Sequence, residues 1–307
     1  MTFTLLLNQM IKFFLIMALG YFLFKKNFTN IEFNKRLSRI LLNITLPALI
    51  LNSVLTQTDR PAAFSVFSVF LTAFLLYLLL PLAGIFAARF FPADEKQKNL
   101  YAFMTAYSNI GFMGFPIIDA LYGSTAVLYT AIFNIMFNLS CYTLGTVIMT
   151  RNSETGARIN PRHLISPGFL LSFASILIYF INPSFPKALT DTISAVGGIT
   201  TPLSMLLIGS TLATNSVKEI FSDRFLYFFT VFRQIFLPLV SLGLIHLLIK
   251  DELIRNVTCV MMLMPAANSC VMFANEHSAD EKLASKSVFL TTLLSIITIP
   301  LGVLLLI

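Results

Sequence analysis

The chain has 307 residues, of which 57% are hydrophobic, 13% are aromatic and only 11% are charged, whereas about 25% of the residues of an ordinary soluble domain are charged. This composition and the mean hydropathy of +0.83 exclude a soluble enzyme, a disulfide-rich secreted domain and a disordered chain, because the polar side chains are too few to cover a soluble surface. The sequence therefore predicts an all-α integral membrane protein.

The three cysteines, Cys141, Cys259 and Cys270, each lie inside an apolar stretch, without the spacing of a metal site. They are expected to be small buried residues rather than disulfide partners or zinc ligands. We expect no metal and no other cofactor.

Ten apolar stretches approach the length of about 20 residues that a helix needs to cross the hydrocarbon core. They are residues 4–24, 38–57, 62–90, 98–121, 125–149, 164–181, 190–213, 224–249, 254–275 and 283–306. Breakers such as Pro92, Gly123 and Pro183 separate neighbouring stretches. A linker at 151–163 divides the chain into two halves of five spans each, 1–150 and 164–307.

The loops between these spans differ strongly in their content of Lys and Arg. One set of alternating loops holds most of the cations, and the opposite set holds only Arg60, Lys187, Lys250 and Arg255. By the positive-inside rule, the cation-rich loops face the cytoplasm and both termini lie on the non-cytoplasmic side of the plasma (inner) membrane. The net charge of +7 then indicates topology and contact with anionic membrane lipids, not nucleic-acid binding.

The two halves share weak sequence matches at one common offset of 157 residues. The matched pairs are Asp94 with Asp251, Lys98 with Arg255, Asn99 with Asn256 and Pro81 with Pro238. Because each half has an odd number of spans, the second half would enter the membrane from the opposite side. Such inverted repeats are typical of secondary transporters, whose binding sites lie where discontinuous helices meet.

The fourth and ninth spans are interrupted at equivalent points of the two halves. The fourth contains Tyr107-Ser-Asn-Ile-Gly-Phe-Met-Gly-Phe-Pro116, and the ninth contains Met264-Pro-Ala-Ala-Asn-Ser-Cys270. If the two broken helices cross, their half-helix N-termini can hold an anion. The predicted binding residues are Ser108, Asn109, Gly111, Gly114, Pro116, Pro265, Asn268, Ser269 and Cys270. The alternative is a pair of ordinary kinks, since Gly and Pro are common in membrane helices.

Other polar residues within the spans are further candidates. Asn134, Asn138 and their repeat equivalents Thr291 and Ser295 either line the site or form interhelical hydrogen bonds. Three charged residues are candidates for coupling or gating: Asp119, Glu276 and Arg233. For the two carboxylates the alternative is solvent exposure at span ends. For Arg233 the alternatives are pairing with a backbone helix end and snorkelling.

Three segments resemble the auxin efflux carrier family, which contains plant carriers and bacterial organic-anion permeases. They are Asn109–Pro116, Pro265 with Val271–Glu276, and Leu46–Leu49. The resemblance spans essentially the whole chain. It implies a homodimer with ten helices in two inverted repeats, a scaffold from spans 1, 2, 6 and 7, and a transport unit from spans 3–5 and 8–10. It also implies elevator-type movement around crossing spans 4 and 9.

The chain departs from the plant members at Ser108 and Cys270, where plant carriers have proline, and it lacks their long cytoplasmic loop. These departures favour a small carboxylate such as malate or malonate over an auxin-like acid. The sequence thus predicts a secondary active transporter of a small organic anion, with proton or sodium as the coupling ion. The alternatives are a sodium-coupled symporter of the bile-acid-transporter type and a non-transporting sensor or channel. An enzyme is not expected, because the spans hold no cluster of His and acidic residues.

Overall fold

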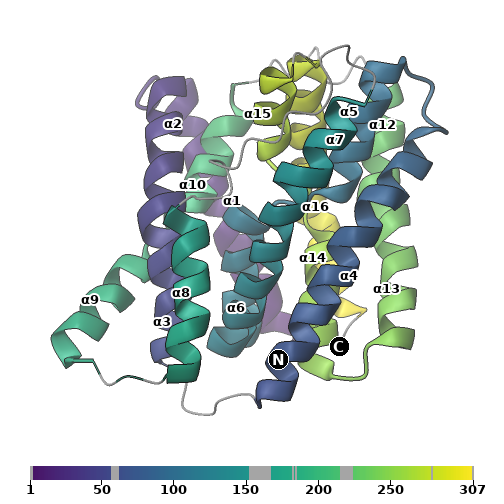
Figure 1. The fold of residues 1–307 in the computed structure, drawn as a ribbon. Helices are drawn as coiled ribbons and strands as arrows, with labels where there is room; N and C mark the ends of the chain where they lie inside the picture. Colours follow the sequence, from purple (N-terminus) through teal and green to yellow (C-terminus); the bar gives the residue numbers. More distant parts are fainter. Residues whose placement is uncertain are drawn as a thin grey trace. The chain divides into compact units, whose positions relative to one another are not determined.

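A computed structural model of the chain describes residues 3–56, 62–151, 167–181, 183, 185–214, 224–277 and 279–305. Within these residues, all regular structure is helical apart from one isolated antiparallel bridge between Ser108 and Ala266 (Figure 1). The expected all-α fold is therefore confirmed for this part of the chain. The predicted turn at Arg60 and nearly all of the linker 151–163 lie outside the described residues.

Within the described residues, seven helical stretches are long and apolar enough to cross a membrane, which makes the chain a multi-pass membrane protein. They are Leu7–Lys25, Ile31–Leu55, Ala63–Ala88, Ile110–Met149, Lys187–Leu212, Phe225–Leu248 and Glu281–Leu304. Three of the ten predicted spans are not long helices of their own. Spans 98–121 and 254–275 are interrupted, and the helix described within span 164–181, α8 (Pro167–Ile181), has 15 residues.

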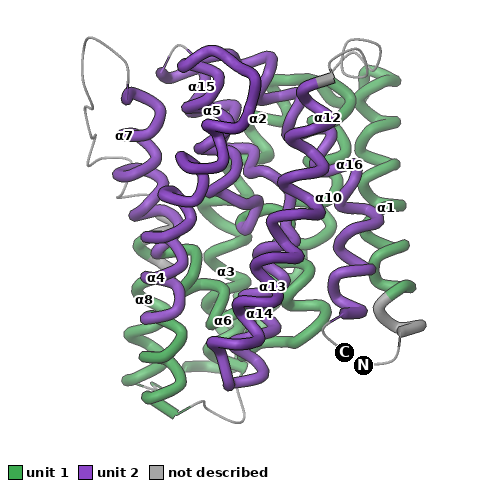
Figure 2. Tube along the Cα trace, turned by 90° about the vertical axis from the view of Figure 1, so that its right-hand side faces the viewer, with its two compact units in different colours: residues 1–70, 111–135, 165–214 green, residues 71–110, 136–164, 215–307 purple. Residues whose placement is uncertain are grey.

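The chain divides into two compact units, each assembled from separate parts of the sequence (Figure 2). Unit 1 comprises Met1–Phe70, Gly111–Ile135 and Ile165–Thr214. Unit 2 comprises Leu71–Ile110, Met136–Leu164 and Asn215–Ile307. Unit 1 thus includes spans 1, 2, 6 and 7, which were expected to form the scaffold, together with residues 111–135.

Unit 1 is a set of helices held together through small and polar residues. Its helices are α1 (Phe3–Lys25), α2 (Ile31–Ile40), α3 (Leu46–Leu55), α8, α9 (Lys187–Gly198) and α10 (Thr200–Leu212), with parts of α4 (Ala63–Ala88) and α6 (Phe115–Ser140). The helix α3 packs on α8 and α9, and α1 packs along α10 (Figure 1). A Cβ atom on Gly209 would overlap the backbone carbonyl of Met17, so only glycine permits this close approach of α1 and α10.

Unit 2 contains the remainder of α4 and α6 and the helices that follow them. These are α5 (Glu95–Ala106), α7 (Thr146–Met149), α12 (Arg224–Val231), α13 (Leu237–Leu248), α14 (Glu252–Leu263), α15 (Ser269–Glu276) and α16 (Glu281–Leu304). The helix α16 packs against α12, α14 and α15, while α15 also contacts α5 and α7 (Figure 1). The ring of Phe91 stacks on Tyr101, with 4.9 Å between centroids, and lies close to Phe229. All three of these aromatic side chains are buried in the core of the unit.

Three turns of π-helix each end two residues before a proline. They are η1 (Leu41–Thr45) before Pro47, η2 (Ile110–Gly114) before Pro116 and η5 (Phe232–Phe236) before Pro238. Proline has no N–H group and clashes with the carbonyl four residues earlier, and a wider turn relieves that clash. A further π-turn, η3 (Cys141–Gly145), follows α6.

The helices α5 and α14 are built alike. Each has 12 residues and begins after an aspartate N-cap. The carboxylate of Asp94 accepts from the Gln97 N–H at 2.8 Å, and that of Asp251 accepts from the Ile254 N–H at 2.9 Å. These bonds satisfy backbone donors at the helix starts that have no partner within the helix.

The predicted boundary between the fourth and fifth spans lies at Gly123, where two helices meet within α6. Gly123 has φ 73° and ψ −163°, outside the helical region, and separates residues 115–122 from 124–140. Glycine is favoured here because a side chain rarely adopts a positive φ. The second helix begins directly after Gly123, so the stretch Ile110–Met149 contains parts of two predicted spans.

Candidate functional site

The two helix breaks in unit 2 pair with each other through their backbones. The helix α5 ends at Ala106 and α14 ends at Leu263, and the segments that follow them are antiparallel neighbours. The Asn109 N–H donates to the Pro265 carbonyl at 2.8 Å, and the Ala267 N–H donates to the Tyr107 carbonyl at 3.1 Å. Each break therefore supplies partners for polar backbone groups of the other, as irregular backbone at membrane depth requires. We call residues 107–109 and 264–268 the paired breaks.

The guanidinium of Arg233 contacts both helix ends that lead into the paired breaks. Arg233 lies in η5 and is fully buried. Its Nε donates to the Met104 carbonyl at 3.2 Å, its Nη1 donates to the Met262 carbonyl at 3.3 Å, and its Nη2 donates to Ser108 Oγ at 2.7 Å. Of the two alternatives to a coupling role considered for Arg233, the structure shows pairing with backbone helix ends and not snorkelling.

A threonine on α16 holds the second break from its other side. Thr291 Oγ1 accepts a hydrogen bond from the Ala266 N–H at 3.3 Å. The Thr291 carbonyl accepts from Nε2 of Gln234 at 2.7 Å. Gln234 is 1% exposed and was not among the predicted residues. Its position beside Arg233, within the apolar run Phe-Arg-Gln-Ile-Phe, is the signal that could have identified it.

The side chains at the paired breaks are buried, and almost all of them are neutral. Ser108 and Asn109 are 4% and 3% exposed, and Cys270 is completely buried. Asn268 and Ser269 are half-buried at the start of α15, and the Ser269 hydroxyl has no hydrogen-bond partner within the described residues. The amide and hydroxyl side chains at the paired breaks suit an anion, because these groups can donate hydrogen bonds to it.

The remaining predicted residues are distributed over both units. Gly111, Gly114, Pro116, Asp119 and Asn134 belong to unit 1. Of these, Gly114, Pro116 and Asn134 are buried and the other two are half-buried.

In unit 2, Asn138 is half-buried and Glu276 is exposed at the end of α15, which agrees with the solvent-exposed alternative for this carboxylate. Ser295 is buried, and its hydroxyl donates to the Thr292 carbonyl of its own helix at 2.6 Å.

The comparison with known families gives a match along nearly the whole chain. The profile of the family described as "Membrane transport protein" matches residues 5–303. The chain belongs to this family. The match confirms the resemblance to auxin efflux carriers that the motifs around Asn109 and Pro265 indicated. Members of the membrane transport protein family are transporters, so this chain is a membrane transporter and not an enzyme.

Individual relatives within the family are distant but cover the chain well. An "Uncharacterized transporter" of Methanothermobacter thermautotrophicus is 25% identical, covering 93% of each chain. The "Uncharacterized transporter YfdV" of Escherichia coli is 22% identical, covering 98% of this chain and 97% of its own. A "Putative malonate transporter" of Rhizobium meliloti is 24% identical, covering 74% of this chain and 72% of its own.

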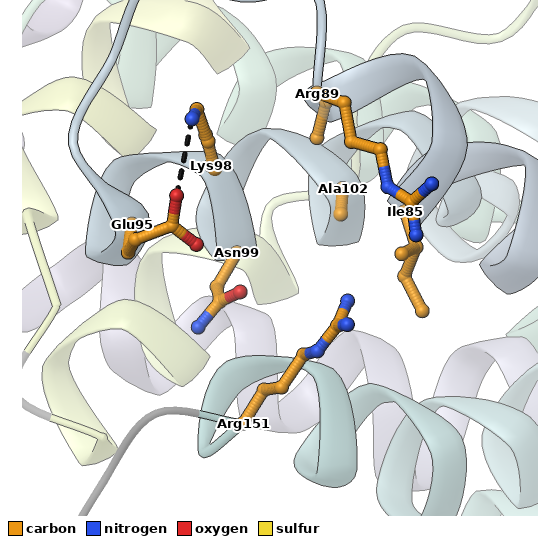
Figure 3. A pocket seen from close by; sticks show the side chains of 8 residues that line it. Ile85, Arg89, Glu95, Lys98, Asn99, Ala102 and Arg151 are labelled. Atoms are coloured by element: carbon orange, nitrogen blue, oxygen red, sulfur yellow. Dashed lines mark hydrogen bonds and ion pairs between the residues drawn. The ribbon is translucent and has the colours of Figure 1, made fainter.

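The transporter also has a cavity of about 240 Å³ in unit 2 that none of the paired-break residues lines. Figure 3 shows the guanidinium groups of Arg89 and Arg151 extending into it, with Asn99 beside them and Lys98 paired to Glu95 at 3.0 Å. Arg89, Lys98 and Arg151 all belong to the cation-rich set of loops. The fold therefore gathers cations from separate loops of that set into one cavity.

Proposed function

We propose that this membrane transport protein is a secondary active transporter of a small organic anion, a carboxylate such as malonate or malate. The observation that carries the proposal is the pairing of two helix breaks around one buried arginine. Their amide, hydroxyl and backbone groups are suited to a carboxylate, and Arg233 donates hydrogen bonds to Ser108 and to the helix ends that lead into both breaks. The description of one relative as a "Putative malonate transporter" supports the same class of substrate.

The proposed architecture is ten transmembrane helices in two inverted five-helix repeats, with both termini on the non-cytoplasmic side of the plasma (inner) membrane. The equal lengths of α5 and α14, their aspartate caps 157 residues apart and the breaks that follow both helices support the repeat. In this arrangement the cations near the cavity face the cytoplasm and contact anionic lipids. Ser108, Asn109 and Pro265, with Gly111, Gly114 and Pro116 beyond the first break, form the substrate site together with Asn268, Ser269 and Cys270.

The proposed mechanism is elevator-type alternating access in a homodimer, in which a transport unit carries the substrate past a scaffold. The expected scaffold spans lie within unit 1 and both breaks lie within unit 2, which supports this partition, whereas residues 111–135 of the expected transport unit belong to unit 1. Within this mechanism, Asn134, Asn138 and Ser295 line the route of the substrate, and Asp119 and Glu276 act in gating.

Counterflow in proteoliposomes tests the proposed activity. Vesicles loaded with unlabelled malonate, malate or indole acetate should accumulate the same labelled acid transiently, because a carrier exchanges substrate stoichiometrically whereas a channel or a sensor does not. We expect exchange of at least one of the two dicarboxylates. Absence of exchange with every carboxylate would contradict the proposal.

A further inference from the structure

The environment of Arg233 is unusual for a buried charge. The side chain is fully buried, yet within the described residues it forms no ion pair with a carboxylate. It donates hydrogen bonds to the backbone carbonyls of Met104 and Met262 and to the hydroxyl of Ser108. A buried charge is costly unless it is compensated, so the compensation must come from these neutral groups.

The two carbonyls belong to the negative ends of two helices. Met104 lies in the last turn of α5 and Met262 in the last turn of α14. The final carbonyls of a helix have no partner within the helix, and the macrodipole gives that end about half of a negative elementary charge. Two such ends carry about one negative charge together, which is the charge that one guanidinium balances.

Helix ends of this kind can bind an ion in other transporters. Unwound carbonyls and half-helix C-termini of secondary transporters coordinate the coupling Na⁺ or receive the coupling proton. Here the N–H groups of Arg233 already occupy the corresponding carbonyls of both half-helices.

We propose that the guanidinium of Arg233 takes the place of a bound cation at the paired breaks. It positions the ends of α5 and α14 against each other and neutralises their negative partial charges, so that these ends neither repel an anionic substrate nor need a bound cation. This inference rests on the proposed function in placing the substrate at the paired breaks. Arg233 is a positioning residue, because it acts on the substrate through Ser108 and the two helix ends.

Three substitutions separate the charge of Arg233 from its geometry. Arg233→Ala removes both and leaves space for a small cation, Arg233→Gln keeps hydrogen-bond donors without the charge, and Arg233→Lys keeps the charge without the planar fork. The matched control is Arg36→Gln, because the Arg36 side chain is exposed and pairs with Glu32 on the same helix.

Two measurements are made on each purified, full-length variant. The first is the thermal unfolding midpoint in Na⁺, in N-methyl-glucamine and in millimolar guanidinium, all as chloride salts. The second is malonate counterflow in the same three salts. The unfolding midpoint is measured without substrate, so it shows the contribution of Arg233 to stability even if malonate is not transported.

The wild type should unfold and transport equally in Na⁺ and in N-methyl-glucamine. Arg233→Ala and Arg233→Gln should lose about tenfold or more of the transport, since hydrogen bonds from a charged group are strong. The unfolding midpoint should fall in both variants, and millimolar guanidinium should partly restore transport and midpoint in Arg233→Ala. Arg233→Lys should retain more transport and a higher unfolding midpoint than Arg233→Gln.

A wild-type protein that needs Na⁺ for stability or transport would overturn the inference, even where malonate transport itself is established. Equal behaviour of Arg233→Lys and Arg233→Gln would also overturn it, because it would show that the charge has no role. If the wild type exchanges no carboxylate, the proposed function fails, and the unfolding midpoints alone decide whether Arg233 takes the place of a bound cation. If Arg233→Ala does not fold, the comparison of the lysine and glutamine variants decides the question.

Discussion

Asn109 has one role that its backbone performs and another that its side chain can perform. Its N–H group donates to the Pro265 carbonyl, and alanine would keep that bond. The side chain is 3% exposed and would supply the amide that recognises a carboxylate. Backbone pairing therefore preserves the break in an alanine variant, while the recognition group is lost.

We expect Asn109→Ala to reduce carboxylate counterflow about tenfold or more, the equivalent of one or two hydrogen bonds to a charged ligand. The unfolding midpoint should remain close to that of the wild type. Asn43→Ala is the matched control, because Asn43 is exposed and outside the paired breaks, and its transport should be unchanged. Unaltered counterflow in Asn109→Ala would remove Asn109 from the substrate site.

The packing of α1 on α10 depends on glycine at the contact. We expect Gly209→Ala to destabilise the protein by about 1–3 kcal/mol, the usual cost of overpacking, because the new Cβ would meet the Met17 backbone. In Gly198→Ala, at the end of α9, the new Cβ has no atom within 4 Å. Gly198→Ala is therefore the control. Its stability should equal that of the wild type or exceed it by up to about 1 kcal/mol, since alanine restricts the unfolded chain. Chemical unfolding in detergent measures the free energy of unfolding of both variants. Equal changes in the two variants would contradict the close contact between α1 and α10.

The helices α5 and α14 should depend equally on their aspartate caps. Asp94→Ala and Asp251→Ala should each destabilise the protein by about 1 kcal/mol, the typical contribution of an N-cap. The corresponding asparagine variants should lose much less, because asparagine also accepts the capping bond. Unfolding titrations of the four variants give the comparison. A loss at only one of the two caps would count against the equivalence of the two helices in a repeat.

The topology of the whole molecule can be tested through its loops. The native cysteines are all buried, so an impermeant maleimide should label the wild type little. We expect Lys250→Cys to react from outside intact cells and Arg89→Cys to react only in inverted membrane vesicles, because the positive-inside rule assigns their loops to opposite sides. Both native side chains are exposed. Labelling of the two positions from the same side would refute the proposed orientation.

Several features of the fold could be read from local sequence. The apolar stretches predict membrane helices because length and composition decide whether a helix can span the bilayer. Asp94 and Asp251 indicate helix starts, and the family motifs that begin at Asn109 and Pro265 indicate helix breaks. These signals need only neighbouring residues, since capping, breaking and membrane insertion are local properties.

The number of helices of spanning length differs from the number that local sequence predicted. Ten apolar stretches were expected, whereas seven helices of the described chain reach spanning length. Gly123 separates two helices, as the sequence predicted, but the second helix begins at the next residue, so the two form one uninterrupted stretch, Ile110–Met149.

The sequence by itself determined that this chain is an apolar, multi-pass helical protein of the membrane transport protein family, with two helix breaks at matching positions. Only the tertiary structure decided what those breaks contact. Arg233 meets Ser108 across 125 residues of sequence and Met104 across 129, while Gln234 reaches Thr291 across 57. Such contacts depend on how distant helices pack, and no local pattern of hydrophobicity or propensity encodes them. The charge of the candidate site and its balance by two helix ends follow from that packing.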